Sequence, residues 1–365
     1  MAAKTMVYLV LFFHLHFHLH CFFDTYTYTW LFMIFHPSII ALYLSSLLLS
    51  FMICYASYFA VQIVIHWDIR SGSELQLVLE RKTYLISTLL TYLFGFELVS
   101  LFLYIYTTDQ LHTLFVGAMC AAGSLKANDF GYPALLLKAF NFLVAGLWLI
   151  LNFTDNRGYD YPLIKKKYSL LLALAPLILA EMILQASYFL RLEPNIITSC
   201  CGSLFSIGEE GIASELASLP SIPMKVAFYL CLTVMTGAGL RFYRTSRGGY
   251  LFSAMSGITF IVSIVSLISF ISLYYYELPT HHCPFCILQK EYGYIGYPLY
   301  VALFGSGVCG LGVGILMPFR SVQSLRDVLP SIQKRLALVS LILILLFAAL
   351  ITYRMVFSDF RLEGY

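Results

Sequence analysis

The sequence predicts an all-α integral membrane protein, built as a bundle of about eight transmembrane helices whose short outer loops carry cysteines. Hydrophobic residues make up 60% of the 365 residues and charged residues only 11%, and the mean hydropathy is +0.82. So little charge would not cover the surface of a water-soluble domain of this length. Long apolar stretches alternate with short charged ones, and they are continuous, which favours helices and excludes a membrane β-barrel.

Eight apolar stretches have the length that a membrane span needs, about 20 residues. Backbone groups in hydrocarbon must bond within their own segment, so each stretch is expected to be a helix. In chain order the predicted spans are Ser38–His66, Tyr84–Tyr106, Tyr132–Phe153, Tyr168–Leu190, Met224–Leu240, Leu251–Tyr274, Tyr292–Met317 and Leu336–Tyr353. No linker divides them, so we expect residues 37–365 to form a single helical transmembrane domain.

The N-terminal residues 1–36 are a separate hydrophobic segment. Met6–Phe23 has the composition of a ninth span or a signal-anchor, and Lys4 before it would then be cytoplasmic. A start codon assigned upstream of the true one, at Met33, would explain the segment equally well. A convincing small-residue cleavage site is lacking, which argues against a cleaved signal peptide.

The Lys and Arg residues predict the orientation, because cytoplasmic loops are enriched in them. Every second connection carries fourteen of them: Arg70, Arg81, Lys82, Arg157, Lys165, Lys166, Lys167, Arg241, Arg244, Arg247, Arg320, Arg326, Lys334 and Arg335. The opposite face carries five: Lys126, Arg191, Lys290, Arg354 and Arg361. We therefore expect a multi-pass protein of the inner (plasma) membrane, with residues 107–131, 191–223, 275–291 and the C-terminus outside. The net charge is only +3 and the sequence contains no basic block, so we expect no nucleic-acid partner.

The distribution of the nine cysteines is the main functional clue. Cys54, Cys231 and Cys309 lie within predicted spans, where cysteine is usually a small packing residue, and Cys21 lies in the N-terminal segment. The other five all fall in the predicted outer loops: Cys120, Cys200, Cys201, Cys283 and Cys286. Disulfides persist in the outer compartment, so this placement predicts thiol chemistry or disulfides there.

The strongest local motif is His281-His282-Cys283-Pro284-Phe285-Cys286, directly before a predicted span. At a helix start, Cys283 would lie near unpaired backbone N–H groups and the positive end of the helix dipole. Such surroundings favour the thiolate, the reactive form in disulfide exchange. The C-x-x-C spacing allows an exchangeable disulfide. His281 and His282 would add positive charge or relay a proton.

Residues 283–290, Cys-Pro-Phe-Cys-Ile-Leu-Gln-Lys, resemble the C-x-x-C-[Ile/Val]-x-[Glu/Gln]-Arg segment of DsbB-type disulfide-bond oxidases. They are also similar to the C-x-x-C helix of vitamin K epoxide reductases. The resemblance implies that Cys283 and Cys286 are the pair next to a bound quinone. Lys290 takes the place of the family's quinone-side Arg, and Gln289 that of its acid or amide. Both families have fewer spans than this chain, and the rest of the chain shows no such likeness.

The same resemblance implies a second cysteine pair that exchanges with a periplasmic thioredoxin-like partner. In the epoxide reductases the loop cysteines precede the C-x-x-C motif in the chain. The same order here leaves Cys120, Cys200 and Cys201 for that role. A disulfide between the adjacent Cys200 and Cys201 closes a strained ring, so Cys120 bonded to either is an alternative. The expected function is a thiol–disulfide oxidoreductase that exchanges electrons between this partner and membrane quinone; its redox direction is open because potential depends on which form is stabilised.

Two other interpretations of the cysteines stay open. Cys120, Cys200, Cys201, His281, His282 and Cys283 offer ligands suited to Cu(I), Hg(II) or Zn, which would make the chain a metal-binding or metal-transport protein. Thr198-Ser199-Cys200-Cys201 is somewhat similar to the vicinal-cysteine segment of mercuric-ion transport proteins. Alternatively, the cysteines form purely structural disulfides on a transporter or scaffold.

Three charged residues lie deep inside predicted spans: Glu97, Lys138 and Glu181. Charges at such depth are costly and usually face a partner or a cavity. We expect either a structural pair of Lys138 with a carboxylate or a proton path. Each acid lies 13 residues past the tyrosine that begins its predicted span, and each span leads to a Cys-bearing loop with Gly-Ser-Leu, which suggests a weak internal repeat.

Overall fold

The computed structural model of the chain describes residues 35–193, 196–198, 212–360 and 362. The segment Met6–Phe23 and the pair Cys200-Cys201 lie outside the described residues. Within them the protein is all-α, and eight helices are long and apolar enough to cross a membrane. The predicted fold class, a multi-pass helical membrane protein, is confirmed.

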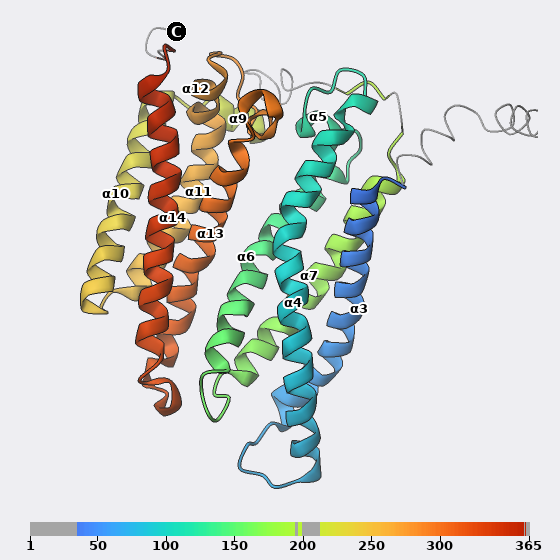
Figure 1. Ribbon diagram of the computed structural model, residues 1–365, viewed down its shortest axis with the longest axis vertical. Helices are drawn as coiled ribbons and strands as arrows, with labels where there is room; N and C mark the ends of the chain where they lie inside the picture. Colours follow the sequence, from blue (N-terminus) through green and yellow to red (C-terminus); the bar gives the residue numbers. More distant parts are fainter. Residues whose placement is uncertain (1–34, 194–195, 199–211, 361, 363–365) are drawn as a thin grey trace, which may run out of the picture.

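The eight long helices lie where the sequence predicts them. Their bounds are α3 Pro37–His66, α4 Glu74–Gln110, α6 Gly131–Asp155, α7 Ile164–Leu190, α10 Ser221–Thr245, α11 Gly249–Ser266, α13 Gly296–Leu316 and α14 Leu329–Phe357. A π-helical turn, Leu267–Ile271, carries α11 on into α12, Ser272–Tyr276. The short helices α5, Ala121–Leu125, and α9, Ile212–Ala217, lie at the same end of the molecule as α12 (Figure 1).

Local capping explains where α4 departs most from its prediction. It begins at Glu74, ahead of the predicted Tyr84, because the side chain of Ser73 accepts a hydrogen bond from the backbone N–H of Gln76 at 3.3 Å. This polar first part of α4 extends beyond the apolar stretch on which the prediction depends. Hydropathy locates the hydrocarbon segment of a helix but not the solvated turns that its cap adds.

The helices form two four-helix bundles (Figure 1). In the first bundle, residues 37–190, each of α3, α4, α6 and α7 packs on the next, and α7 closes the ring against α3. In the second, residues 221–357, α10, α11, α13 and α14 do the same, and α14 packs on α10. The sequence analysis did not predict this division.

The two bundles meet along their third helices, α6 and α13. A Cβ added to Gly146 would lie 2.7 Å from a methyl carbon of Val308, and the rings of Phe142 and Phe304 are 5.1 Å apart. Glycine therefore permits this close approach, as small residues do between membrane helices. The seam consists of Phe142, Gly146 and Ile150 on α6 against Phe304, Val308 and Gly312 on α13.

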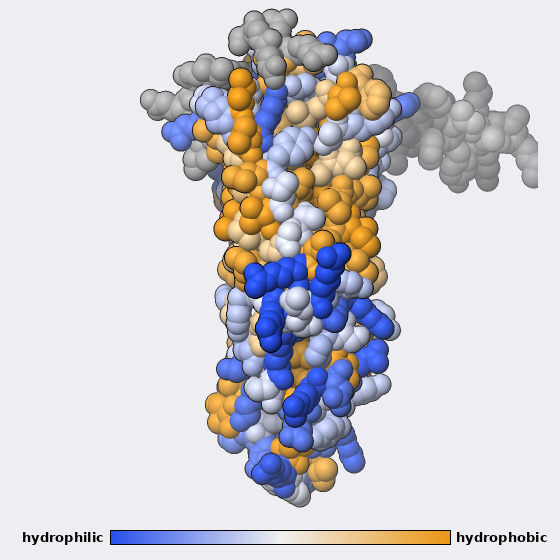
Figure 2. Space-filling view, turned by 90° about the vertical axis from the view of Figure 1, so that its left-hand side faces the viewer, coloured by the Kyte–Doolittle hydropathy of each residue, from blue (hydrophilic) through white to orange (hydrophobic). Residues whose placement is uncertain are grey.

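The surface of the second bundle has the pattern of a membrane protein. Along α10 the exposed residues Ile222, Val226 and Leu230 recur every fourth position and form one apolar stripe. Three exposed arginines, Arg241, Arg244 and Arg247, follow at the end of the helix and in its turn. Figure 2 shows this side of the molecule with hydrophobic residues gathered above a group of hydrophilic ones. Charged and apolar surface are thus separated along the helix axis, as a bilayer requires.

The molecule has two ends, which we name by their sequence. At the basic end lie the connections between α3 and α4, α6 and α7, α10 and α11, and α13 and α14. At the cysteine end lie the connections that contain Cys120, between α4 and α6, and Cys283 and Cys286, between α12 and α13. The last helix also ends there, close to the C-terminus (Figure 1). Each of these cysteine loops follows the second long helix of its bundle.

Candidate functional site

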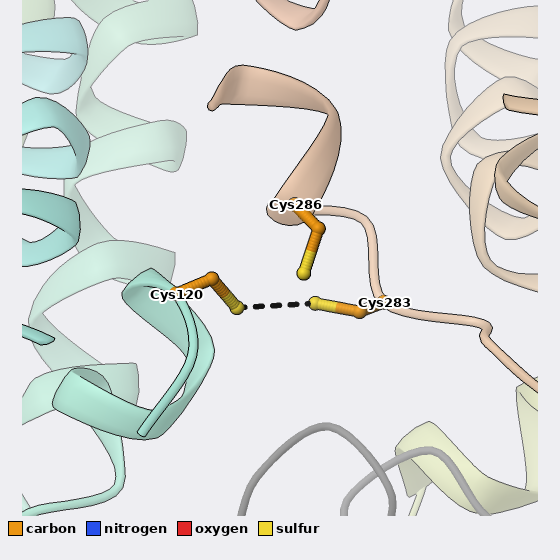
Figure 3. Close-up of side chains that lie close together, drawn as sticks. All are labelled: Cys120, Cys283 and Cys286. Carbon is orange, nitrogen blue, oxygen red and sulfur yellow. Dashed lines mark hydrogen bonds between the residues drawn. The ribbon is translucent and has the colours of Figure 1, made fainter. Parts of the chain in front are cut away.

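Three cysteine sulfurs meet at the cysteine end, between the two bundles (Figure 3). The Sγ atoms of Cys120, Cys283 and Cys286 all lie within 4.8 Å of one another. The Sγ atoms of Cys120 and Cys283 are 3.5 Å apart, which is contact distance and longer than the roughly 2.0 Å of a disulfide bond. All three side chains are buried, with exposed fractions of 0%, 0% and 4%. Residues 163 positions apart in the chain therefore share one enclosed thiol site, here called the thiol cluster.

Asp109 positions Cys120. The loop after α4 makes a 3₁₀ turn, Leu111–Leu114, and returns so that Cys120 precedes the first residue of α5. A carboxylate oxygen of Asp109 accepts a hydrogen bond of 3.0 Å from the backbone N–H of Ala121. Asp109 is buried at the end of α4. This bond fastens the first turn of α5, and with it Cys120, to the end of α4.

Two tyrosines hold the C-x-x-C loop. The hydroxyl of Tyr276 donates to the carbonyl of Cys283 and accepts from the backbone N–H of Ile287 at 3.0 Å. The hydroxyl of Tyr300 donates to the carbonyl of Pro284 at 2.7 Å. Because two carbonyls within the motif and the amide that follows it are fixed in this way, the two cysteines are presented in one geometry.

The expectation that Cys283 stands at a helix start is wrong. The loop residues after Cys283 form only the 3₁₀ turn Cys286–Leu288, and the long helix α13 begins at Gly296. The tyrosine bonds to the backbone of the motif hold it as a loop, so Cys283 is not part of a helix N-terminus. Instead, the backbone N–H of Phe285 donates to the Cys283 sulfur at 3.5 Å. An amide of the same loop thus contacts the sulfur where a helix end was expected to do so.

The two cysteine loops are bonded directly to each other through Gln289. Its side-chain amide donates to the carbonyl of Met119 at 2.7 Å and to Asp109 at 3.3 Å. Gln289 belongs to the loop of the second bundle, and Met119 and Asp109 belong to the first. Asp109 therefore contacts both loops, and it fixes the spacing between Cys120 and the C-x-x-C motif.

The two histidines of the motif have different surroundings. Nε2 of His281 lies 3.3 Å from the Cys286 sulfur, and its ring packs edge-on against Tyr276. His282 is buried and its Nδ1 lies 2.9 Å from the carbonyl of Ile268, within the π-helical turn. Because a carbonyl only accepts, Nδ1 of His282 carries a proton there. His281 is thus placed to exchange a proton with Cys286, whereas His282 braces the loop against the π-helical turn.

The structure brings together only some of the predicted site residues. Cys120, Cys283 and Cys286 meet, and Gln289 lies beside them. Lys290 follows in the 3₁₀ turn Lys290–Tyr292 and is exposed. Cys200 and Cys201 lie outside the described residues.

Glu97, Lys138 and Glu181 form a separate buried cluster in the core of the first bundle. The Lys138 amine lies 2.5 Å from Glu181 and 3.9 Å from Glu97. Glu97 precedes Asp109 by 12 residues on α4, which places the cluster about 18 Å from the cysteine end at 1.5 Å per residue. Glu97 lies on α4 and Glu181 on α7, the two helices that the sequence suggested as a repeat. Both helices belong to the first bundle, and both acids approach Lys138.

The sequence analysis missed Asp109, Tyr276 and Tyr300 as site residues. Tyr276 looked like one of many interfacial aromatic residues at span ends, and Tyr300 lay inside a predicted span. Asp109 carried a usable signal, because it is an acid just after a predicted span, in the same outer loop as Cys120. The position of the backbone groups that these side chains bind cannot be predicted from spacing.

No protein-family model, curated protein sequence or solved structure matches this chain.

Proposed function

We propose that the protein is a membrane thiol–disulfide oxidoreductase that exchanges electrons between a thioredoxin-like partner and membrane quinone. The observation that carries the proposal is the thiol cluster, in which a third cysteine lies against a C-x-x-C pair. Two cysteines close one disulfide, whereas three sulfurs within 4.8 Å of one another allow a disulfide to be passed from one pair to another. The resemblance of residues 283–290 to quinone-linked oxidases supports the same chemistry.

The exchange step follows from the arrangement of the three sulfurs. The thiolate of Cys120 attacks the Cys283 sulfur of a Cys283–Cys286 disulfide, since this approach is the 3.5 Å contact. The Cys120–Cys283 bond forms as the Cys283–Cys286 bond breaks, and the electron pair leaves on Cys286. His281 Nε2, 3.3 Å from that sulfur, protonates the departing thiolate. One disulfide replaces another, so this step needs no oxidant.

In this proposal the thiol cluster exchanges electrons with the quinone through Cys283 and Cys286 and with the protein partner through other cysteines. When the Cys283 and Cys286 thiols close to a disulfide, they lose two electrons and two protons, which a quinone takes up as it becomes a quinol. In our proposal the exposed Lys290 contacts the quinone, and Gln289 holds the loop that presents it. The buried cluster needs accessible sulfurs to reach a protein partner, and we assign this task to Cys200 and Cys201. The cysteine end then faces the outside of the plasma membrane, where such partners occur.

The test is a thiol titration of the purified full-length protein with a mass-tag alkylating reagent, before and after adding a soluble ubiquinone analogue. We expect quinone to convert Cys283 and Cys286 from alkylatable thiols to a disulfide. In the C286S variant Cys283 has lost its C-x-x-C partner, so the added quinone should oxidise Cys120 and Cys283 to a disulfide, taking up two electrons and two protons, and the bond should link the peptides from the two bundles. The C309S variant, altered within α13, is the matched control and should behave as the unmodified protein does.

A soft-metal site is the second candidate, favoured by the mutual distances in the thiol cluster. Sulfurs around a tetrahedral zinc lie about 3.8 Å apart, given Zn–S distances near 2.3 Å, so separations within 4.8 Å need little adjustment. The third ligand is Cys286, which the sequence analysis had not included, and His281 adjoins it. Thiols that ignore quinone but are protected from alkylation by Cu(I), Hg(II) or Zn would replace the redox proposal with this one.

A further inference from the structure

The buried cluster in the first bundle contains two acids and one base. Glu97 on α4, Lys138 on α6 and Glu181 on α7 have exposed fractions of 4%, 1% and 2%. The other two helices that pack on this part of the bundle, α3 and α13, contain no Asp, Glu, Lys or Arg. The titratable neighbours, Tyr104 and Tyr188, are phenols that stay neutral near pH 7. With every group ionised, the cluster would hold an uncompensated negative charge within the membrane, which is costly.

The hydrogen bonds distinguish the two carboxyl groups. One oxygen of Glu181 accepts from the Lys138 amine at 2.5 Å, and the other accepts from the Asn141 amide at 2.6 Å. Charge-assisted bonds on both oxygens are the pattern of an ionised carboxylate. Glu181 is therefore the partner of the Lys138 cation.

Glu97 has the surroundings of a protonated acid. Its Oε2 accepts a bond of 3.2 Å from the Ser100 hydroxyl, while its buried Oε1 has no donor and lies 3.9 Å from the Lys138 amine. The Glu97 and Glu181 carboxyls both approach the same Lys138 amine, which brings them close to each other. Two carboxylates in such contact repel each other, whereas a carboxylic acid donates to a carboxylate. The buried Oδ1 of Asn141, a second oxygen without a donor, also belongs to this cluster.

We propose that Glu97 and Glu181 form a proton-binding site within the membrane that holds one exchangeable proton above the Lys138 cation. The ligand is a single proton, carried on Glu97 and hydrogen-bonded towards Glu181. The site comprises one Lys and two Glu, so charge balance requires one bound proton. This requirement does not depend on the thiol chemistry. Loss of the proton leaves a net negative charge, and its return restores neutrality.

A second buried ion pair in the same bundle shows what a site without such a proton looks like. The Lys167 amine lies 2.7 Å from Asp155, and both side chains have an exposed fraction of 0%. Lys167 also donates to Asn152 at 3.0 Å. One acid faces one base here, so the charges balance with both groups ionised. This pair is a matched control for the trio.

Infrared spectroscopy of the purified full-length protein, in a detergent without ester groups, tests the proposal near pH 7. A protonated carboxyl has a C=O stretch separate from the bands of carboxylates, and it shifts in D₂O. We expect the E97Q variant to lose one carboxylic-acid equivalent. E181Q should lose the same equivalent, since the single remaining acid then pairs with Lys138 and ionises. K138M should gain one equivalent, because two acids are left without a cation.

The control variant D155N should leave the carboxylic-acid band unchanged. A band that survives in both E97Q and E181Q would overturn the proposal, as would the lack of any such band in the unmodified protein. Sodium or potassium that abolishes the band at constant pH would also overturn it, because a metal cation would then supply the missing charge. Each Gln variant tests the site without the other, so the proposal does not depend on the folding of K138M.

Discussion

At the scale of single residues, a few polar side chains decide the geometry of the thiol cluster. Asp109 receives hydrogen bonds from the Ala121 amide and from Gln289, and it thereby connects the loops of both bundles. Tyr276 and Tyr300 fix the backbone from Cys283 to Ile287. The cysteines themselves supply the reactive atoms, but these neighbours determine that the sulfurs of Cys120 and Cys283 meet.

Replacement of Asp109 should separate the sulfurs without removing them. Asp109→Leu loses hydrogen bonds to a partly buried carboxylate, each contributing about 1.5–3 kcal/mol. We expect the rate of disulfide formation between Cys120 and Cys283, measured by mass-tag alkylation in the C286S background, to fall by at least about tenfold, since 1.4 kcal/mol is a factor of ten. Asp109→Asn keeps one accepting oxygen and should restore most of the rate. Equal rates for the Leu variant and the unmodified residue would show that Asp109 does not position the cluster.

At the scale of elements, the two bundles contact each other through the third helix of each, α6 and α13. The small residues Gly146 and Gly312 let α6 and α13 approach closely. The side chain of Val308 packs against Gly146, and that of Ile150 packs against Gly312. This seam determines how the two cysteine loops face each other. Loop chemistry at the cysteine end therefore depends on helix packing in the membrane.

The Gly146→Leu variant tests this dependence. The new side chain overlaps Val308 and should force α6 from α13, at a cost of about 1–3 kcal/mol for an overpacked core. We expect lower thermal stability in detergent and a smaller yield of the Cys120–Cys283 cross-link with a short bifunctional thiol reagent. Gly95→Leu on α4 is the control, because a Cβ there meets nothing within 4 Å. If both variants cross-link as the unmodified protein does, the seam does not set the sulfur spacing.

At the scale of the whole molecule, two four-helix bundles place their cysteine loops in equivalent positions. Each loop follows the second long helix of its bundle, and the third helices, which follow the loops, form the seam. The thiol cluster thus lies at the end of the contact between the bundles. Neither bundle contains the cluster by itself, since Cys120 belongs to the first and Cys283 and Cys286 to the second.

The distribution of Lys and Arg predicts the orientation of this whole assembly. An alkaline phosphatase domain, active only outside the cytoplasm, should be active when fused after Tyr365 and inactive when fused after Arg247. The reason is that cytoplasmic connections are enriched in basic residues, as the basic end is here. A cytoplasmic reporter fused at the same two positions should give the opposite pattern. Activity of the phosphatase after Arg247 would invert the proposed orientation and move the thiol cluster to the cytoplasmic side.

Hydropathy and charge along the chain suffice to predict the all-α membrane class, the number and approximate positions of the eight described long helices, and the separation of basic from cysteine-bearing connections. These properties follow from local composition, because hydrocarbon selects apolar helices of a fixed length whatever their neighbours. The sequence also identified five loop cysteines, three of which lie in the described thiol cluster. Three features became visible in the folded chain alone: Cys120 approaches Cys283, Asp109 and Gln289 connect the loops, and Glu97 and Glu181 share one lysine. These contacts join residues far apart in the chain, and they depend on how the helices pack, which hydropathy and spacing do not encode.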